Sequence, residues 1–231
     1  MAEIIPAVMA ESVDDLRDKL SLVEGLVPLI QLDVMDGEFV PSRDWPYTPG
    51  GFEELRTIIE EEEGLPFWNS IDYEIDLMVE RPEEVIADWV TAGVRRVIVH
   101  FESTDNLEAL CTEFAREYQA LDSSNPPELG LAVNIDTPNE EIEPYLEMVD
   151  FVQYMGIERI GYQEQPFDER VLLKIADLRV GFPDMVISVD GGVNLETAPL
   201  LIAAGADRLA VGSALFETEN IEETLAELKS F

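Results

Sequence analysis

Short runs of strand-forming residues alternate with longer stretches of helical periodicity along the whole chain, and this alternation constrains the fold most. Eight such runs occur, at residues 4–7, 29–34, 73–79, 97–100, 129–134, 151–155, 186–189 and 209–211. Between them, apolar residues recur at helical spacing, as at Val13, Leu16 and Leu20. Strict alternation requires parallel strands joined by right-handed crossovers, and eight such units close a barrel. The sequence therefore predicts an α/β fold, a (β/α)8 TIM barrel, with residues 1–231 as a single domain because no linker divides them.

The expected ends of several helices carry their own signals. Ser12 and Asn194 each precede a helical stretch, where a side-chain oxygen can accept hydrogen bonds from free backbone N–H groups, so both are predicted N-caps. Gly93, Gly181 and Gly205 stand where helices are expected to stop, because glycine readily adopts the left-handed conformation that follows many helices.

The charge balance limits the partners of the chain. Asp and Glu total 50 residues against 14 Lys and Arg, which gives a formal net charge of −36. Such a surface repels nucleic acid and anionic membranes, so neither is an expected partner. It also repels a phosphorylated substrate at long range, unless salt screens the field within about 10 Å. Two explanations of the charge stay open, namely adaptation to a salt-rich cell interior and simple solubility.

Cysteine usage and hydropathy indicate the compartment. The single cysteine, Cys111, excludes an internal disulfide, and a reducing cytoplasm is the expected location. A membrane span needs about 18 consecutive apolar residues, and we expect none because the chain has no such stretch. The first ten residues have neither a basic start nor a long apolar run, so we expect no signal peptide.

In a TIM barrel the residues at the carboxyl ends of the strands face the active site. The chain places the following there: Asp33, Met35, Asp76, Met78, His100, Asn134, Met155, Asp190, Gly212 and Ser213. Each has an ordinary structural reading as well. Methionines fill cores, aspartates cap helices, a lone histidine packs, and glycine pairs form turns. Two neighbouring helix N-termini, at Gly191–Gly192 and Gly212–Ser213, would however bind a phosphate at the usual place in such barrels.

Residues 32–41, Leu-Asp-Val-Met-Asp-Gly-Glu-Phe-Val-Pro, resemble the DVMDGxFVP signature of the ribulose-phosphate 3-epimerases. Further similar segments follow in the family's order and span nearly the whole chain: residues 77–79 with Pro82, 99–102, Asn134 with Thr137 and Pro138, 189–194 and 204–216. The resemblance implies a barrel of the ribulose-phosphate-binding type.

The resemblance also implies an activity. The family's enzymes interconvert ribulose 5-phosphate and xylulose 5-phosphate in the pentose phosphate pathway, moving a proton at the carbon beside a ketone. Two aspartates on opposite faces of an ene-diolate act as base and acid, and by motif these are Asp33 and Asp190. Inversion through a planar intermediate needs one titratable group on each side. The resemblance also implies these substrate contacts: Met35, Met78, Met155, Asn134, Gly191, Gly192, Gly212 and Ser213.

The chain departs from the family at the metal. The family binds a divalent metal through two histidines and the two catalytic aspartates, and the histidine positions are Gln31 and Asp76 here. Converging carboxylates without a cation would repel one another. The set of Gln31, Asp33, Asp76 and Asp190 offers only oxygen ligands, which suit Mg²⁺ or Mn²⁺ better than Zn²⁺. We expect a hard-cation site, and a lost site is the alternative.

The phosphate side departs too. The family's glycine-rich PGFGGQ loop corresponds to residues 160–165, Ile-Gly-Tyr-Gln-Glu-Gln, where two glycines are replaced and Glu164 enters. Bulkier residues limit the approach of backbone N–H groups to a phosphate. Arg159 is either a compensating cation or a solvated surface residue, and the family's serine after the proline of the first strand is Ala7 here.

Three functions stay open after these departures. The first is an epimerase acting on a pentulose phosphate or a close ketose phosphate, with an altered metal. The second is a barrel isomerase whose substrate carries no phosphate or a different polar group. The third is a catalytically silent barrel that binds a different sugar or polar ligand. Family members often form dimers or hexamers, so the resemblance also implies a homo-oligomer.

Overall fold

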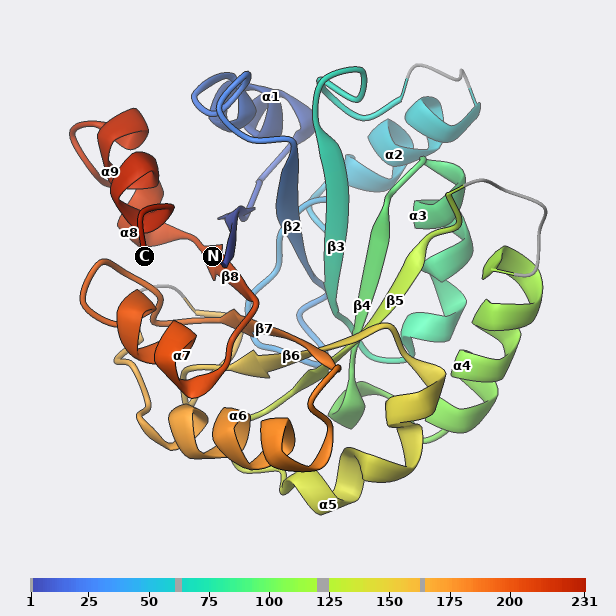
Figure 1. The fold of residues 1–231 in the computed structure, drawn as a ribbon. Helices are drawn as coiled ribbons and strands as arrows, with labels where there is room; N and C mark the ends of the chain where they lie inside the picture. Colours follow the sequence, from blue (N-terminus) through green and yellow to red (C-terminus); the bar gives the residue numbers. More distant parts are fainter. Residues whose placement is uncertain (1, 61–63, 120–124, 163–164) are drawn as a thin grey trace.

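Eight parallel strands close into a barrel in which each strand pairs with its neighbours in sequence and β1 pairs with β8 (Figure 1). The computed structural model describes residues 2–60, 64–119, 125–162 and 165–231. The strands are β1 Glu3–Val8, β2 Leu29–Met35, β3 Asp72–Met78, β4 Arg96–His100, β5 Glu128–Val133, β6 Phe151–Met155, β7 Val186–Asp190 and β8 Arg208–Val211. Every predicted run is a strand, so the predicted (β/α)8 barrel is confirmed.

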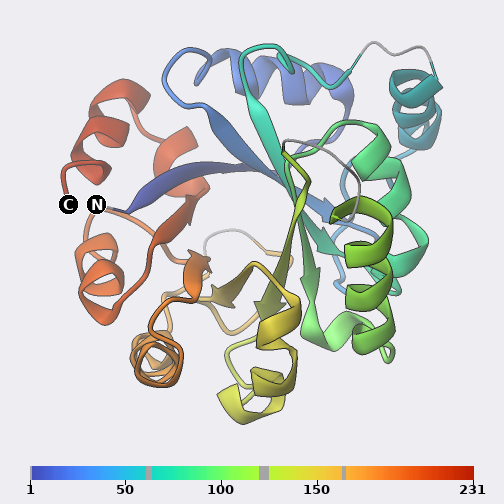
Figure 2. The ribbon, with the colours of Figure 1, turned by 45° about the vertical axis from the view of Figure 1, so that its right-hand side comes forward.

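Helices form the outer layer of the barrel (Figure 2). The α-helices are α1 Val13–Ser21, α2 Gly51–Glu60, α3 Ile86–Thr91, α4 Leu107–Phe114, α5 Asn139–Ile142, α6 Arg170–Gly181, α7 Ala198–Ala204, α8 Ser213–Phe216 and α9 Ile221–Leu228. The segments of 3-10 or π-helix are η1 Pro82–Glu84, η2 Phe101–Ser103, η3 Ala115–Gln119 and η4 Glu143–Met148. No helix within the described parts of the chain is long and apolar enough to cross a membrane.

The helix-end predictions are partly confirmed. The Ser12 side chain accepts a hydrogen bond from the Asp15 N–H at 3.2 Å and caps α1. Asn194 was placed too close to its helix, since α7 begins at residue 198 with Thr197 as its N-cap. The Asn194 oxygen instead accepts from the N–H groups of Glu196 and Thr197, so it caps the turn that leads into α7.

The three glycines predicted at helix ends lie at or just after the last turn of a helix. Gly93 and Gly205 have positive φ, at 92° and 117°, and lie directly after the last turns of α3 and α7. Gly181 is the last residue of α6. Glycine tolerates the left-handed region without the steric strain of a Cβ atom, which explains its use at Gly93 and Gly205.

Two different environments surround the strands. Between the strands and the helices lies one large apolar core, built from residues such as Leu32, Ile75 and Val97. Inside the barrel many side chains are polar yet fully buried, among them Gln31, Glu74, Asp76, His100, Gln153 and Ser188. Buried polar groups must be hydrogen-bonded or paired to be tolerated. Fewer kinds of side chain are therefore tolerated inside the barrel than in the apolar core between the strands and the helices.

The N-terminal ends of the strands meet in a buried ion network. The Arg96 guanidinium lies 2.9 Å from Glu74, 3.2 Å from Glu128 and 3.3 Å from Glu3. Arg208 lies 3.2 Å from Glu3 and 3.4 Å from Glu128. Three carboxylates and two guanidinium groups thus fill this end of the barrel, opposite to the carboxyl ends of the strands.

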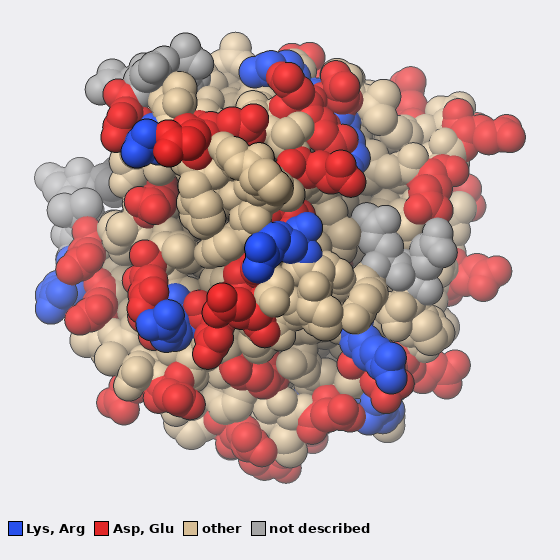
Figure 3. Space-filling view, turned by 180° about the vertical axis from the view of Figure 1, so that it is seen from behind, with Lys and Arg blue, Asp and Glu red and all other residues tan. Residues whose placement is uncertain are grey.

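The outer surface is strongly acidic. On the face shown in Figure 3, Asp and Glu side chains are spread over the surface and clearly outnumber Lys and Arg. Acidic groups distributed in this way repel other polyanions.

Candidate functional site

A cavity of about 430 Å³ opens among the loops that follow the strands. It is lined by these predicted site residues: Asp33, Met78, Met155, Asp190, Gly191, Gly192, Gly212 and Ser213. The predicted residues Met35, Asn134, Gln31 and Asp76 do not line it. Most of the residues selected from the strand ends therefore surround one common space.

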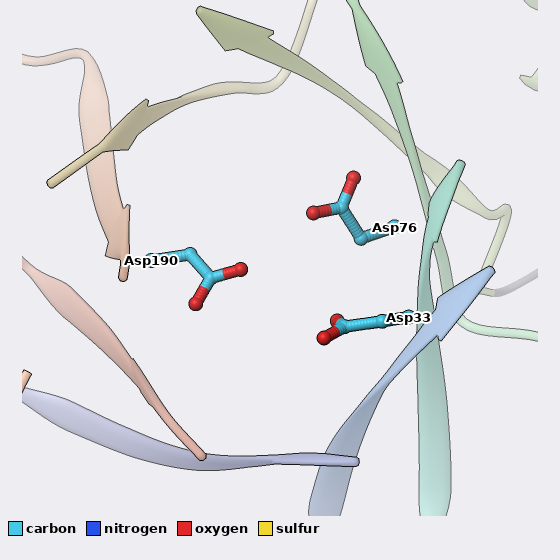
Figure 4. Close-up of side chains that lie close together, drawn as sticks. All are labelled: Asp33, Asp76 and Asp190. Carbon is cyan, nitrogen blue, oxygen red and sulfur yellow. The ribbon is translucent and has the colours of Figure 1, made fainter. Parts of the chain in front are cut away.

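Three carboxylates converge beside this cavity (Figure 4). Asp33 in β2 and Asp76 in β3 are register partners on adjacent strands, and Asp190 ends β7. Figure 4 shows Asp190 pointing across the opening toward the other two. One oxygen atom of each carboxylate lies within 4.8 Å of the others. The alternation of side chains along a strand brings this about, because the three residues all face the barrel interior.

The Gln31 side chain joins two of these carboxylates. Its Nε2 donates to Asp33 Oδ1 at 2.8 Å and to Asp190 Oδ2 at 2.9 Å. Gln31 lies two residues before Asp33 on β2, so its side chain points to the same interior. One amide group therefore holds Asp33 and Asp190 facing each other across the barrel.

The environment shifts the titration of both aspartates in the same direction. Burial, and then the charges of Asp190 and Asp76, raise the pKa of Asp33 well above its usual range. Burial, and then the charge of Asp76, raise the pKa of Asp190 to about 7. A carboxyl group that titrates near neutrality can both accept and donate a proton, as general acid–base catalysis requires.

Asp76 is held by hydrogen bonds from two other strands. His100 Nε2 lies 3.1 Å from Asp76 Oδ1, and Gln153 Nε2 donates to Asp76 Oδ2 at 3.2 Å. The Ser188 hydroxyl donates to Gln153 Oε1 at 3.1 Å. Burial opposes the charge of His100, yet the Asp76 carboxylate raises the pKa of this histidine. His100 is fully buried and does not line the cavity, so it contacts the site only through Asp76.

Methionines form an apolar wall of the cavity. Met78 and Met155 line it directly, as predicted. Met35 packs with Met78 in one small buried cluster and lies behind this wall. Met9 also lines the cavity and was missed, because the predicted first strand stopped before the turn that carries it.

Glycine turns form another part of the cavity lining. Gly191 and Gly192 have φ of +92° and +69°, which favours glycine at both positions. A Cβ atom on Gly191 would lie 2.8 Å from Ile157 Cγ1, so this turn also needs a residue without a side chain. Gly191 and Gly192 line the cavity together with Gly212 and Ser213.

The loop after β6 is only partly described. Gly161 and Tyr162 line the cavity, while residues 163–164, and with them the predicted Glu164 substitution, lie outside the described residues. Among the described residues that line the cavity there is no Lys or Arg, and Arg159 is exposed elsewhere. Glu217 adds a carboxylate to the lining. Backbone N–H groups and neutral side chains such as Asn194, Ser213 and Thr218, and no basic side chain, are therefore the donors that the described lining offers to an anionic ligand.

Asn134 takes part in a different set of contacts. Its N–H donates to Glu102 Oε1 at 3.0 Å, and its carbonyl oxygen accepts from Lys174 Nζ at 3.0 Å. Its side-chain oxygen is buried without a hydrogen-bond partner. A contact of Asn134 with substrate stays a prediction.

The second aspartate of the β2 motif has a structural role. Asp36 Oδ1 accepts from the N–H groups of Glu38 and Phe39 at 2.7 and 2.9 Å, and Asp36 Oδ2 accepts from the Glu80 N–H at 2.7 Å. Asp36 therefore ties the loop after β2 to the loop after β3. These hydrogen bonds are those of a residue that caps a turn.

A further buried carboxyl, Asp44, was not singled out in the sequence. Its Oδ1 accepts from the Met35 N–H at 2.6 Å, and its Oδ2 is buried without a hydrogen-bond partner. Burial raises the pKa of Asp44 to about 8, with a smaller contribution from the charge of Asp76 and an opposing one from Lys19. The carboxyl is therefore protonated at neutral pH.

The Asp44→Asn variant tests this assignment. The folded pKa of Asp44 lies above its unfolded value of 3.8, so its contribution to stability is complete below that value and is lost as pH rises through about 8. Relative to the variant, the unfolding free energy of the wild type is expected to fall by up to about 1.4 kcal/mol per pH unit in this window. Urea unfolding of both proteins between pH 5 and about 9 measures the difference. A constant difference across that range would contradict the assignment.

Comparison with known proteins gives consistent matches. Residues 3–216 match the family described as the ribulose-phosphate 3 epimerase family. The ribulose-phosphate 3-epimerase of Bacillus subtilis is 31% identical over 235 residues, covering 99% of each chain. That of Schizosaccharomyces pombe is 29% identical over 230 residues, covering 99% of this chain and 93% of the other.

Solved structures show the same architecture. The 3-keto-L-gulonate-6-phosphate decarboxylase of Vibrio cholerae superposes with a TM-score of 0.70 at 15% identity, covering 100% of this chain and 95% of that one. At this identity the likeness concerns the fold alone, and it agrees with the closed eight-stranded barrel.

Proposed function

The chain belongs to the ribulose-phosphate 3-epimerase family, and from this premise we propose that it interconverts ribulose 5-phosphate and xylulose 5-phosphate, or a close ketose phosphate. Membership makes the chain an enzyme of the carbohydrate epimerase class. The observation that supports this reaction is the position of Asp33 and Asp190 at one cavity. The Gln31 amide donates a hydrogen bond to each of the two carboxyl groups, and the pKa of each is raised.

The proposed mechanism uses these two carboxyl groups in turn. One aspartate in its carboxylate form takes the proton from C3, and the electrons of the C–H bond move toward the carbonyl oxygen to give an ene-diolate. The other aspartate, as the neutral acid, then donates its proton to C3 on the opposite face. The configuration at C3 is inverted, and the pair keeps one proton overall, which suits two groups with raised pKa.

The same site is proposed to hold Mg²⁺ or Mn²⁺. Asp33, Asp76 and Asp190 place carboxylate oxygens within 4.8 Å of one another, and Gln31 is the fourth proposed ligand. Such a set of oxygens fits a hard cation, and their mutual repulsion favours binding one. When bound, the cation supplies positive charge beside the oxygens of the ene-diolate.

Substrate contacts follow from the cavity lining. Met78 and Met155 are proposed to pack against the carbon skeleton, with Met35 supporting them from behind. The backbone N–H groups at Gly191–Gly192 and Gly212–Ser213 are proposed to bind the phosphate. Asn134 remains the further proposed substrate contact, and a homo-oligomer in the cytoplasm remains an expectation.

Hydrogen exchange at C3 tests the proposed reaction. The protein with MgCl₂ or MnCl₂ in D₂O is expected to incorporate deuterium at C3 of ribulose 5-phosphate and to form xylulose 5-phosphate, both observable by NMR. Ribulose without phosphate serves as the control for the phosphate contacts, and slower exchange is expected with it.

A second candidate function is a barrel that binds a different sugar or polar ligand without epimerising it. Glu217 in the lining, and the absence of Lys and Arg from the described lining, favour this alternative, since a carboxylate repels a phosphate. Thermal stabilisation by ribulose without phosphate, with no exchange at C3 of ribulose or of ribulose 5-phosphate, would support binding alone and would contradict the proposed reaction.

A further inference from the structure

The Gln31 amide is held by hydrogen bonds at one end only. Its Nε2 donates to Asp33 and Asp190, while its Oε1 has no hydrogen-bond partner although the side chain is 0% exposed. A buried amide oxygen without a partner is unfavourable, because it has lost its hydrogen bonds to water without replacing them. The lone pairs of this oxygen are therefore available to a ligand that the amide reaches by turning.

Gln153, in the same barrel interior, has an amide whose orientation is fixed by a hydrogen bond at each end. Its Oε1 accepts from Ser188 at 3.1 Å, and its Nε2 donates to Asp76 at 3.2 Å. Turning this amide end for end would break both bonds and place the Gln153 oxygen against a carboxylate. Gln31 has no bond at its oxygen to lose, so only its two bonds to Asp33 and Asp190 oppose the turn.

The oxygen and nitrogen ends of an amide have nearly the same size and shape. End-for-end rotation of Gln31 therefore needs no additional space in a fully buried site. Without a cation the nitrogen end is favoured, because it donates to two carboxylates. With a cation between the carboxylates the oxygen end is favoured, because the N–H groups would point at a positive charge.

We propose that Gln31 is a two-state residue that selects the cation of this site. In the cation-free protein Nε2 links Asp33 to Asp190, and in the loaded protein the amide is reversed and Oε1 becomes a ligand beside the three carboxylates. An amide oxygen favours Mg²⁺ and Mn²⁺, whereas an imidazole nitrogen at this position would favour Zn²⁺. The proposal rests on the cation site described under the proposed function.

A crystal structure of the wild-type protein grown with MgCl₂ tests the reversal directly. An amide nitrogen does not ligate Mg²⁺. If one of the two amide atoms of Gln31, Oε1 or Nε2, lies at about 2.1 Å from the ion, that atom must be the oxygen. That result is expected. Mg²⁺ bound by the carboxylates, with the Gln31 end atoms still in hydrogen-bond contact with Asp33 and Asp190, would overturn the proposal and leave the cation site intact.

Calorimetric titration with MgCl₂, MnCl₂ and ZnCl₂ tests the selectivity. Gln31→Met keeps the length of the side chain without a ligand atom, and its Mn²⁺ affinity is expected to fall about ten- to a hundred-fold. Gln31→His is expected to raise the preference for Zn²⁺ over Mn²⁺ by about tenfold or more. Gln153→Met is the matched control, expected to weaken binding of all three ions without changing their order.

The outcomes separate this proposal from the ones on which it rests. Binding of Mn²⁺ that is unchanged in Gln31→Met, or a zinc preference unchanged in Gln31→His, would overturn the role of Gln31 alone. Failure of the wild type to bind any of the three ions would overturn the cation site together with this proposal. Neither result decides the proton exchange at C3, which is measured on its own.

Discussion

Replacement of Asp33 by asparagine is expected to lower the rate of inversion at C3 by about 10²–10⁴-fold, the usual contribution of a positioned acid or base. Asparagine has the same shape, and its Oδ1 still accepts the hydrogen bond that Gln31 Nε2 donates at 2.8 Å to Asp33. It cannot take a proton from carbon at neutral pH. The loss is therefore expected in the chemical step, in single-turnover conversion of ribulose 5-phosphate to xylulose 5-phosphate measured by NMR.

Asp190→Asn provides the companion measurement. If the two carboxyls act on opposite faces, each variant alone should stop inversion, and the double variant should lose little more. Both proteins are expected to fold, because removing one of several crowded acidic groups relieves repulsion.

Asp44→Asn is the matched control for these variants. Its carboxyl is also buried with a raised pKa, but it does not line the cavity. Inversion at close to the wild-type rate is expected, since Asp44 is already neutral near pH 7. An Asp33→Asn protein with an inversion rate within about tenfold of this control would contradict the two-aspartate mechanism.

The barrel itself was predictable because its signal is local and repeated. Each strand is a short run buried on both faces, as in β4 and β6, and each is followed by residues at helical spacing. The residues at the carboxyl ends of strands were predictable for the same reason. Asp33, Met78 and Asp190 could be placed at the cavity from their position in a strand alone.

The contacts across the barrel were not predictable from local pattern. Gln31 of β2 reaches Asp190 of β7, and Gln153 of β6 reaches Asp76 of β3, although neither pair lies on adjacent strands. Which side chains meet inside depends on the stagger of all eight strands, and that is a property of the closed barrel. The sequence placed Gln31 among the candidate ligands, but which end of its amide faces the carboxylates required coordinates.

The ion network at the N-terminal end was missed for a related reason. Arg96, Arg208 and Glu3 each stand at the start of a strand, where a charged residue ordinarily ends in solvent. Here the side chains turn into the barrel instead and neutralise one another. The overall acidity of the chain gave no indication of a partly neutralised cluster inside it.

Among the variants predicted here, Arg96→Met is expected to show the largest decrease in the free energy of unfolding. Arg96→Met leaves Glu3 and Glu128 with Arg208, but it removes the ion pair of Glu74, which is fully buried. Removing one partner from a buried charged group typically lowers the unfolding free energy by about 3–5 kcal/mol. Urea unfolding at neutral pH is expected to show a loss of this size.

The double variant Arg96→Met with Glu74→Met separates the charge effect from packing. A buried ion pair replaced by apolar side chains of similar size is often neutral in stability, so the double variant is expected to recover most of the loss. Burial raises the pKa of Glu74 to about 7 despite the opposing effect of Arg96, which indicates that desolvation of this carboxyl already outweighs its pairing. A single variant within about 1 kcal/mol of the wild type, or a double variant no more stable than the single variant, would show that the network is not balanced by charge.

The network lies at the opposite end of the strands from Asp33 and Asp190. C3 exchange by the folded variants should therefore persist. Its loss would indicate that the two ends of the barrel are coupled.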